Sequence, residues 1–148
     1  MPDPDATAIP VLLPDDPARE ALIRRTLATP AASRLGLSLT AAAPGAVEIA
    51  LAHDRANRTE GDVIHGGVIA TLADIAGVAT AISGVRDLPS GGGTGSIAIS
   101  YLRPAVACDL LARGTLLRGG GRQSVVRVSI SAPDDTLVAE AQVTVSLR

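Results

Sequence analysis

The clearest pattern in the chain is an alternation of apolar and polar residues, which predicts strands. From Ala139 to Leu147 every second residue is apolar and the residues between are polar. The same period of two recurs in five further segments: residues 35–39, 47–51, 97–101, 110–117 and 126–130. Residues 43–45, Ala-Pro-Gly, are typical of the turn between the first two of these segments. The pattern predicts a largely antiparallel sheet.

Two segments have the pattern of helices. Asp16 followed by Pro17 is typical of a helix start, and residues 18–27 place apolar side chains on one side. From Gly66 to about Ile82, apolar residues lie on nearly every side of the predicted helix. A helix of that kind must be buried on all sides, which in a small domain requires a sheet wrapped around it. We therefore expect an α+β fold, with one long central helix in the concavity of the sheet.

Composition sets the number of domains and excludes one class of partner. The chain has 148 residues, 47% of them hydrophobic and 19% charged, which is enough for one core and too few for two ordinary domains. We predict a single domain over residues 16–148, preceded by an irregular arm over residues 1–15, which contain four of the ten prolines. A net charge of −2 without a basic stripe makes nucleic acid an unexpected partner.

The location in the cell is predicted from the termini, the cysteine content and the longest apolar run. The first residues are acidic and rich in proline, unlike a signal peptide, and the single cysteine, Cys108, needs no oxidising compartment. The apolar run from Val63 to Ile82 is interrupted by His65 and Asp74, which favours a buried helix over a membrane span. We expect a cytoplasmic protein that does not bind membranes.

The segment His65-Gly66-Gly67, at the start of the predicted central helix, is the first candidate site. The first N–H groups of a helix lack partners within the helix and lie at the positive end of its dipole. Glycine at this point lets a ligand approach the backbone, so the segment suits a developing oxyanion. An equally open interpretation is that the two glycines only make a tight turn from strand to helix.

Asp74 is the second candidate, because it is the only charged residue between Asp62 and Arg86. A buried carboxylate without a partner is costly, so its presence in an apolar helix needs a reason. It is either a base or nucleophile in a cleft, or the acceptor of a structural hydrogen bond to a neighbouring chain.

Other kinds of site are poorly supported. The chain has no G-x-S-x-G segment for a serine nucleophile, and His53, Asp54 and His65 match no zinc-binding spacing. The glycine-rich residues 91–95 lack the lysine and the helix of a phosphate-binding loop, and are interpreted as a flexible lead-in to the next strand. Three arginines could either bind a phosphate at the surface or simply be solvated: Arg103, Arg118 and Arg122.

Residues 63–74, VIHGGVIATLAD, resemble the central-helix motif of the phenylacetate-degradation (PaaI-like) thioesterases of the hotdog superfamily. The similarity extends to residues 94–105, where a strand ends before Pro104-Ala105, to the Gly121-Arg122 turn, and to the last strand. The resemblance runs from about Leu35 to the C-terminus. It implies a hotdog fold and hydrolysis of small or medium acyl-CoA thioesters, without metal or cofactor, in a homodimer or a dimer of dimers.

The resemblance also implies roles for individual residues. The N–H of Gly66 would polarise the thioester carbonyl, and Asp74 would activate water or attack directly. His65 would hold the turn and Thr94 would assist the water. Asn57 is the nearest match to a polar catalytic residue of the family, although the segment between it and His65 is about two residues longer than usual. Candidate substrate-binding residues are Gly67, Arg58, Arg103 and Arg122.

The spacing of Gly66 and Asp74 requires two chains if both residues are catalytic. Eight residues along one helix separate them by about 12 Å. A donor to the carbonyl oxygen and a carboxylate acting on the carbonyl carbon must both lie within about 3 to 5 Å of the reacting group. Two antiparallel protomers would therefore have to meet, forming two equivalent sites in an isologous dimer.

Two alternatives to thioester hydrolysis remain open. A hotdog dehydratase or hydratase would need an acid/base pair that the chain does not show, and a non-catalytic acyl-CoA-binding hotdog module would keep the pocket without turnover. The acyl group is also open. Tyr101 is the only aromatic residue, so the pocket should be lined by aliphatic side chains, which admit several acyl classes.

Overall fold

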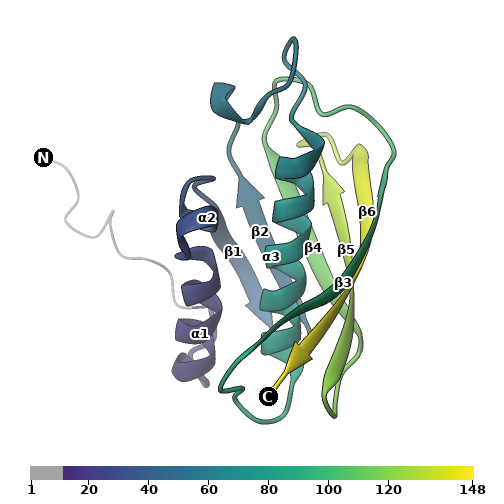
Figure 1. The fold of residues 1–148 in the computed structure, drawn as a ribbon. Helices are drawn as coiled ribbons and strands as arrows, with labels where there is room; N and C mark the ends of the chain where they lie inside the picture. Colours follow the sequence, from purple (N-terminus) through teal and green to yellow (C-terminus); the bar gives the residue numbers. More distant parts are fainter. Residues whose placement is uncertain (1–11) are drawn as a thin grey trace, which may run out of the picture.

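A six-stranded antiparallel sheet forms most of the protein. The computed structural model describes residues 12–148. The strand order is β1-β2-β4-β5-β6-β3, and every neighbouring pair is antiparallel (Figure 1). The strands are β1 (Ser38–Ala43), β2 (Ala46–Leu51), β3 (Gly92–Tyr101), β4 (Leu110–Arg118), β5 (Gln123–Ser131) and β6 (Leu137–Leu147).

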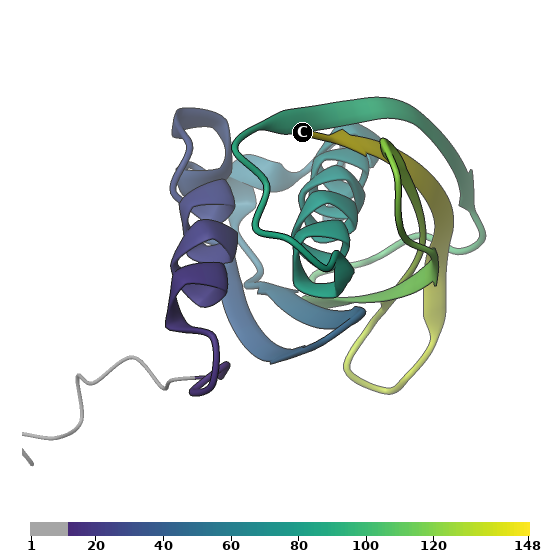
Figure 2. The ribbon, with the colours of Figure 1, turned by 90° about the horizontal axis from the view of Figure 1, so that it is seen from below.

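The sheet curves around one long helix, α3 (Gly66–Gly84) (Figure 2). Helix α1 (Pro17–Leu27) lies beside α3. The short helix α2 (Pro30–Ser33) follows α1 in the chain, and the 3-10 helix η1 (Arg55–Asn57) follows β2. This arrangement confirms the predicted α+β fold with a central helix. The sequence pattern did not predict α2 or η1.

Contacts between α1 and the end of α3 fix the direction of α1. Asp16 caps α1 by accepting a hydrogen bond from the N–H of Arg19, as predicted (3.0 Å). The Arg19 guanidinium donates to the carbonyl oxygen of Ile82 (2.6 Å) and to that of Arg86 (3.2 Å). The start of α1 therefore lies at the C-terminal end of α3, and the two helices run antiparallel (Figure 1).

The core lies between α3 and the concave face of the sheet. The inward residues of β5 and β6 are fully buried, among them Val126, Val128 and Val143. Gly77 allows α3 to approach closely, because a Cβ at this position would lie 2.7 Å from the side chain of Val143. This packing fixes the height of α3 above the sheet, and with it the position of any side chain that α3 presents.

Two expectations from the sequence need correction. Helix α3 is not buried on all sides in the single chain, because sheet and α1 together leave a stripe with Thr71, Asp74 and Val78 only half-buried. The glycine-rich residues are also not a flexible lead-in, since β3 begins at Gly92, and this glycine pairs with Leu147 of β6. Glycine hides the strand from any periodicity analysis because it adds no side chain to the pattern.

The regular pairing of β3 with β6 shifts between Thr94 and Ser96, as in a β-bulge. At the other edge of the sheet, β1 begins at Ser38, later than predicted, because Gly36 adopts a positive φ (63°) in the preceding turn.

The N-terminal arm and the membrane prediction can be compared with the structure only in part. Residues 1–11 of the predicted arm lie outside the described residues, and residues 12–15 form no helix or strand, although Leu13 is buried in the core. By length and composition, α3 passes as a membrane span. More than half of its residues are buried under the sheet and α1, as in a core helix.

Candidate active site

The start of α3 has one backbone donor free. The Nδ1 atom of His65 accepts from the N–H of Gly67 (2.8 Å), and the His65 carbonyl accepts from Val68 (3.0 Å) and Ile69 (3.2 Å). Among residues 12–148 no acceptor is found for the N–H of Gly66. An unpaired N–H at the positive end of a long helix can bind an anionic or carbonyl oxygen. The N–H of the predicted binding residue Gly67 is already used by the cap.

Asn57 lies directly against this helix start. Its carbonyl oxygen accepts a hydrogen bond from the N–H of His65 (2.8 Å), and Asn57 as a whole is buried, with 8% of its surface exposed. The extra residues that separate Asn57 from His65 in sequence form a small loop. A hydrogen bond from the N–H of Thr59 to the carbonyl oxygen of Val63 closes this loop (2.8 Å). The longer spacing therefore does not move Asn57 away from the candidate site.

Tyr101, at the end of β3, also contacts the helix start, and the sequence analysis did not single it out as a site residue. Its hydroxyl donates to the carbonyl oxygen of Gly66 (2.8 Å), and a Cβ on Gly66 would lie 3.4 Å from the Tyr101 ring. A cavity of about 340 Å³ is lined here by Gly66, Tyr101 and Arg103, among others. The one signal in the sequence is that Tyr101 is the only aromatic residue of the chain.

The other end of β3 contacts the middle of α3. The hydroxyl of Thr94 donates to the carboxylate of Asp74, which is half-buried on the open stripe of the helix. A carboxylate held in this way keeps one oxygen for a water molecule or for direct attack. The structure thus brings together two residues, twenty apart in sequence, that were predicted separately.

Gly66 and Asp74 lie on one straight helix, eight residues and about 12 Å apart. A single chain therefore places Asn57, His65, Gly66 and Tyr101 at one end of β3, and Asp74 with Thr94 at the other.

The predicted arginines are spread over both ends of the molecule. Arg58 forms an ion pair with Asp62, and Arg103 donates to the carbonyl of Leu137 (3.4 Å) near the start of α3. Arg122 lies in the β4–β5 turn, where its carbonyl accepts from Leu147. Arg103 contacts the other end of β6, ten residues from Leu147 and about 30 Å away at the rise of a strand. Arg103 and Arg122 of one chain therefore do not share a phosphate.

The family model described as "Thioesterase superfamily" matches residues 61–144. This match covers more than half of the chain and includes the start of α3, Asp74 and Thr94. The chain belongs to the thioesterase superfamily.

Individual proteins agree with this assignment. A candidate esterase of Halobacterium salinarum is 35% identical over 113 residues, which are 73% of this chain and 74% of that protein. The medium/long-chain acyl-CoA thioesterase YigI of Salmonella typhimurium is 30% identical over 94 residues, 55% of this chain and 61% of that protein.

Solved structures share the fold. A thioesterase family protein from Silicibacter pomeroyi superposes with a TM-score of 0.80 at 22% identity, over 87% of this chain and 97% of that one. The PaaI protein of the E. coli phenylacetic acid degradation operon superposes with a TM-score of 0.72 at 17% identity, over 89% of this chain and 95% of that one. The predicted hotdog fold and hydrolase class are thus confirmed.

Two other chemistries find no support in the part of the thioesterase that the structure describes. No group of three or more histidine, cysteine, aspartate or glutamate residues there is placed to hold a metal ion. Burial, and then the negative charge of Asp109, raise the pKa of the Cys108 thiol, which disfavours the thiolate needed for a cysteine nucleophile. The expectation that no metal or cofactor takes part stays a prediction.

Proposed function

We propose that this thioesterase hydrolyses acyl-CoA at two equivalent sites, each built from the two protomers of an antiparallel dimer. One observation carries the proposal: Gly66, whose N–H is free, and Asp74 contact opposite ends of the same edge strand, β3, Gly66 through its carbonyl oxygen and Tyr101, and Asp74 through Thr94. Antiparallel pairing of two such strands brings unlike ends together.

Strand β3 has the features of an interface. It lies at the edge of the sheet, is ten residues long, and leaves every residue exposed or half-buried. A long edge with unpaired N–H and C=O groups invites pairing with another strand. Pairing two copies about a twofold axis near Ile97 would set Thr94 opposite Ser100 of the second copy, since both are three residues from the axis. The Gly66 of the second copy would then approach Asp74.

The chemistry follows from the groups so assembled. The N–H of Gly66 would hydrogen-bond the thioester oxygen and stabilise the negative charge that develops there. Asp74 would take a proton from water as the water attacks the carbonyl carbon, or it would attack that carbon itself. In both routes the C–S bond breaks, and the CoA thiolate leaves and takes up a proton. When water attacks, the fatty acid forms directly; when Asp74 attacks, a mixed anhydride forms on its carboxylate, and a water molecule then hydrolyses it to release the fatty acid and restore Asp74. Thr94 would orient the carboxylate.

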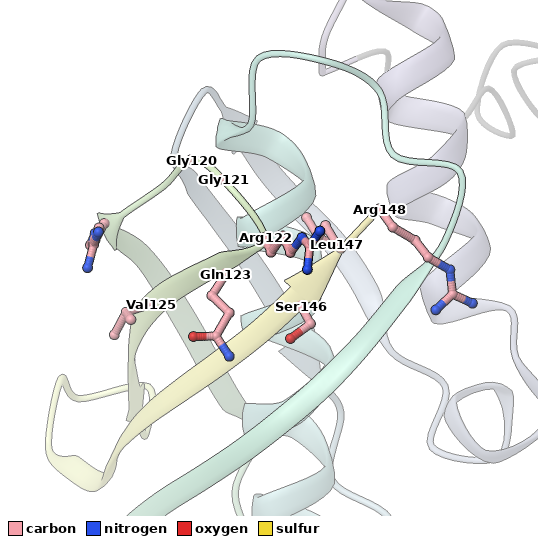
Figure 3. A pocket seen from close by; sticks show the side chains of 9 residues that line it. Gly120, Gly121, Arg122, Gln123, Val125, Ser146, Leu147 and Arg148 are labelled. Atoms are coloured by element: carbon pink, nitrogen blue, oxygen red, sulfur yellow. The ribbon is translucent and has the colours of Figure 1, made fainter.

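The CoA end of the substrate has a place in the same dimer. The β4–β5 turn and the end of β6 form a cavity of about 1020 Å³, whose lining includes Arg118, Arg122 and Arg148 and no acidic residue. Figure 3 shows Arg122 and Arg148 extending in different directions from this surface. Antiparallel pairing of β3 would add Arg103 of the second protomer to this end. Guanidinium groups suit the phosphates of CoA, and an acyl-CoA substrate agrees with the activity named for the Salmonella relative. A cytoplasmic location is part of this proposal.

Release of free thiol from a panel of acyl-CoA esters tests the activity itself. The protein should release CoA from at least one ester at neutral pH. Tight binding of an acyl-CoA without release would contradict hydrolysis and favour the non-catalytic module instead.

Subunit exchange tests the shared site. Asp74→Asn removes the carboxylate, and Gly66→Pro removes the N–H at a position where a helix accepts proline. Each variant alone should be nearly inactive. After mixing with exchange, half of the dimers are mixed and each restores one of its two sites, so activity should return to about one quarter of wild type.

The exchange experiment depends on two folded parents. Circular dichroism of Gly66→Pro and mass spectrometry of the mixed dimers provide this control. With folded parents and confirmed exchange, no recovery of activity would mean that one chain supplies the whole site.

A further inference from the structure

A cavity of about 470 Å³ lies between α1, the second half of α3 and the start of β3. The catalytic proposal does not use it. Aliphatic side chains dominate its lining, and Arg25, exposed on α1, is the only charged residue there. Leu88, which is 48% exposed, also lines the cavity. A cavity of this size and character accepts a small apolar group.

The cavity lies along the same face of α3 as the Asp74 carboxylate. Asp74, Val78 and Ile82 follow one another at intervals of four residues, so they lie on one face of α3, and the last two line the cavity. On the opposite wall, Gly92 lies two residues before Thr94 and therefore faces the same side of β3. Because the hydroxyl of Thr94 contacts Asp74, the entrance of the cavity lies one helical turn beyond the reacting group.

We propose that this cavity binds the acyl chain of the substrate, and that the substrates are esters of medium-length fatty acids. The inference rests on the proposed function. Asp74 and Ile82 are eight residues apart, about 12 Å along the helix. An extended covalent chain advances about 3.5 Å for every three bonds, so about ten bonds span this distance. A decanoyl chain therefore reaches from the carbonyl carbon to the far end of the cavity.

Helix α1 sets the length of chain that fits. It runs antiparallel to α3, because Arg19 donates to the carbonyls of Ile82 and Arg86 at the end of α3. Ala18 therefore lies farther from Asp74 than Ala21 does, by three residues or about 4.5 Å. Both alanines line the cavity and are exposed on α1. A larger side chain at either position would shorten the space from the far side without entering the core.

The test introduces phenylalanine at these two heights and measures kcat/KM for acetyl-, butanoyl-, octanoyl-, decanoyl- and palmitoyl-CoA. Ala21→Phe should lower kcat/KM for decanoyl-CoA by about tenfold or more, because overpacking is costly, and leave acetyl-CoA within about twofold. The longest acyl chain that Ala18→Phe still hydrolyses well should be about four carbons longer than the longest one that Ala21→Phe does. Ala28→Phe makes the same change at an exposed residue just beyond α1 and outside the lining, and should leave the profile unchanged.

The outcomes separate the two proposals. Hydrolysis by the wild type with the same dependence on chain length in both folded cavity variants would overturn the acyl site and leave the proposed function standing. An equal loss for all esters would also overturn it. If the wild type releases CoA from none of the esters, the proposed function fails, and the acyl site fails with it. Circular dichroism identifies a misfolded variant, and either cavity variant decides the question alone.

Discussion

The two ends of β3 contact the same helix through different chemistry. At the first end, the Thr94 hydroxyl donates to a carboxylate, and at the last end the Tyr101 hydroxyl donates to a backbone carbonyl next to a free N–H. The first end can move protons or attack a carbonyl, and the last end can only stabilise negative charge on an oxygen. Each end lacks what the other has, which makes a dimer that joins unlike ends the economical way to build a complete site.

The largest effect should come from removing the carboxylate at the first end. Asp74→Asn is nearly isosteric and removes the proton acceptor, so kcat should fall by two orders of magnitude or more, about 3 kcal/mol in activation free energy. Steady-state kinetics of thiol release measure the loss, and size-exclusion chromatography checks the assembly. If most of kcat remains, Asp74 has a structural role and the two ends do not differ as described.

A smaller effect is expected from the hydroxyl that orients the carboxylate. Thr94→Val keeps the shape of the side chain and removes a hydrogen bond to a charged acceptor, so kcat should fall by about tenfold. Thr144→Val is the matched control, because this threonine is half-buried on the neighbouring strand and makes no side-chain hydrogen bond within residues 12–148. Equal kinetics for the two variants would show that the contact with Asp74 does not matter.

The smallest effect should come from the last end of β3. Tyr101→Phe removes one neutral hydrogen bond, to the carbonyl of Gly66, and keeps the ring packed on the helix start. A bond of this kind contributes about 1 kcal/mol, so kcat/KM should fall about fivefold. The pH dependence of the rate should keep its shape, because no titrating group at the first end is changed. A loss as large as that of Asp74→Asn would assign Tyr101 a direct part in the chemistry.

The amino-acid pattern predicts those parts of the fold in which side chains alternate or repeat. Strand β6 and helix α3 have regular apolar positions over many residues, and the structure has them within two residues of the predicted bounds. The first residues of β3 escape prediction because Gly92 and Gly93 pair through their backbones alone. The short η1 helix spans three residues, too few to show any period.

The site divides in the same way. His65, Gly66 and Asp74 are visible in sequence because they are unusual for an apolar helix. The contacts of Asn57 with His65 and of Tyr101 with Gly66 depend on how loops and strands pack, over eight and thirty-five residues of chain, and no local pattern encodes them. The proposed pairing of two protomers depends in turn on the exposed edge of β3, which becomes apparent only when the strand order is known.

The irregularity between Thr94 and Ser96 makes Gly95 a spacer that sets the phase of the strand. Thr94 and Ile97 both face α3 although they are three residues apart, because one extra residue is absorbed between them. Regular pairing of all the residues of β3 would leave Ile97 and everything after it in place, and would turn Thr94 to the outer face of the sheet, away from Asp74. The bulge therefore acts as a change of phase that points the Thr94 hydroxyl at the carboxylate without moving the core residues of the strand. Deletion of Gly95 should consequently be tolerated, because it makes the pairing regular and leaves Thr94 opposite Val145.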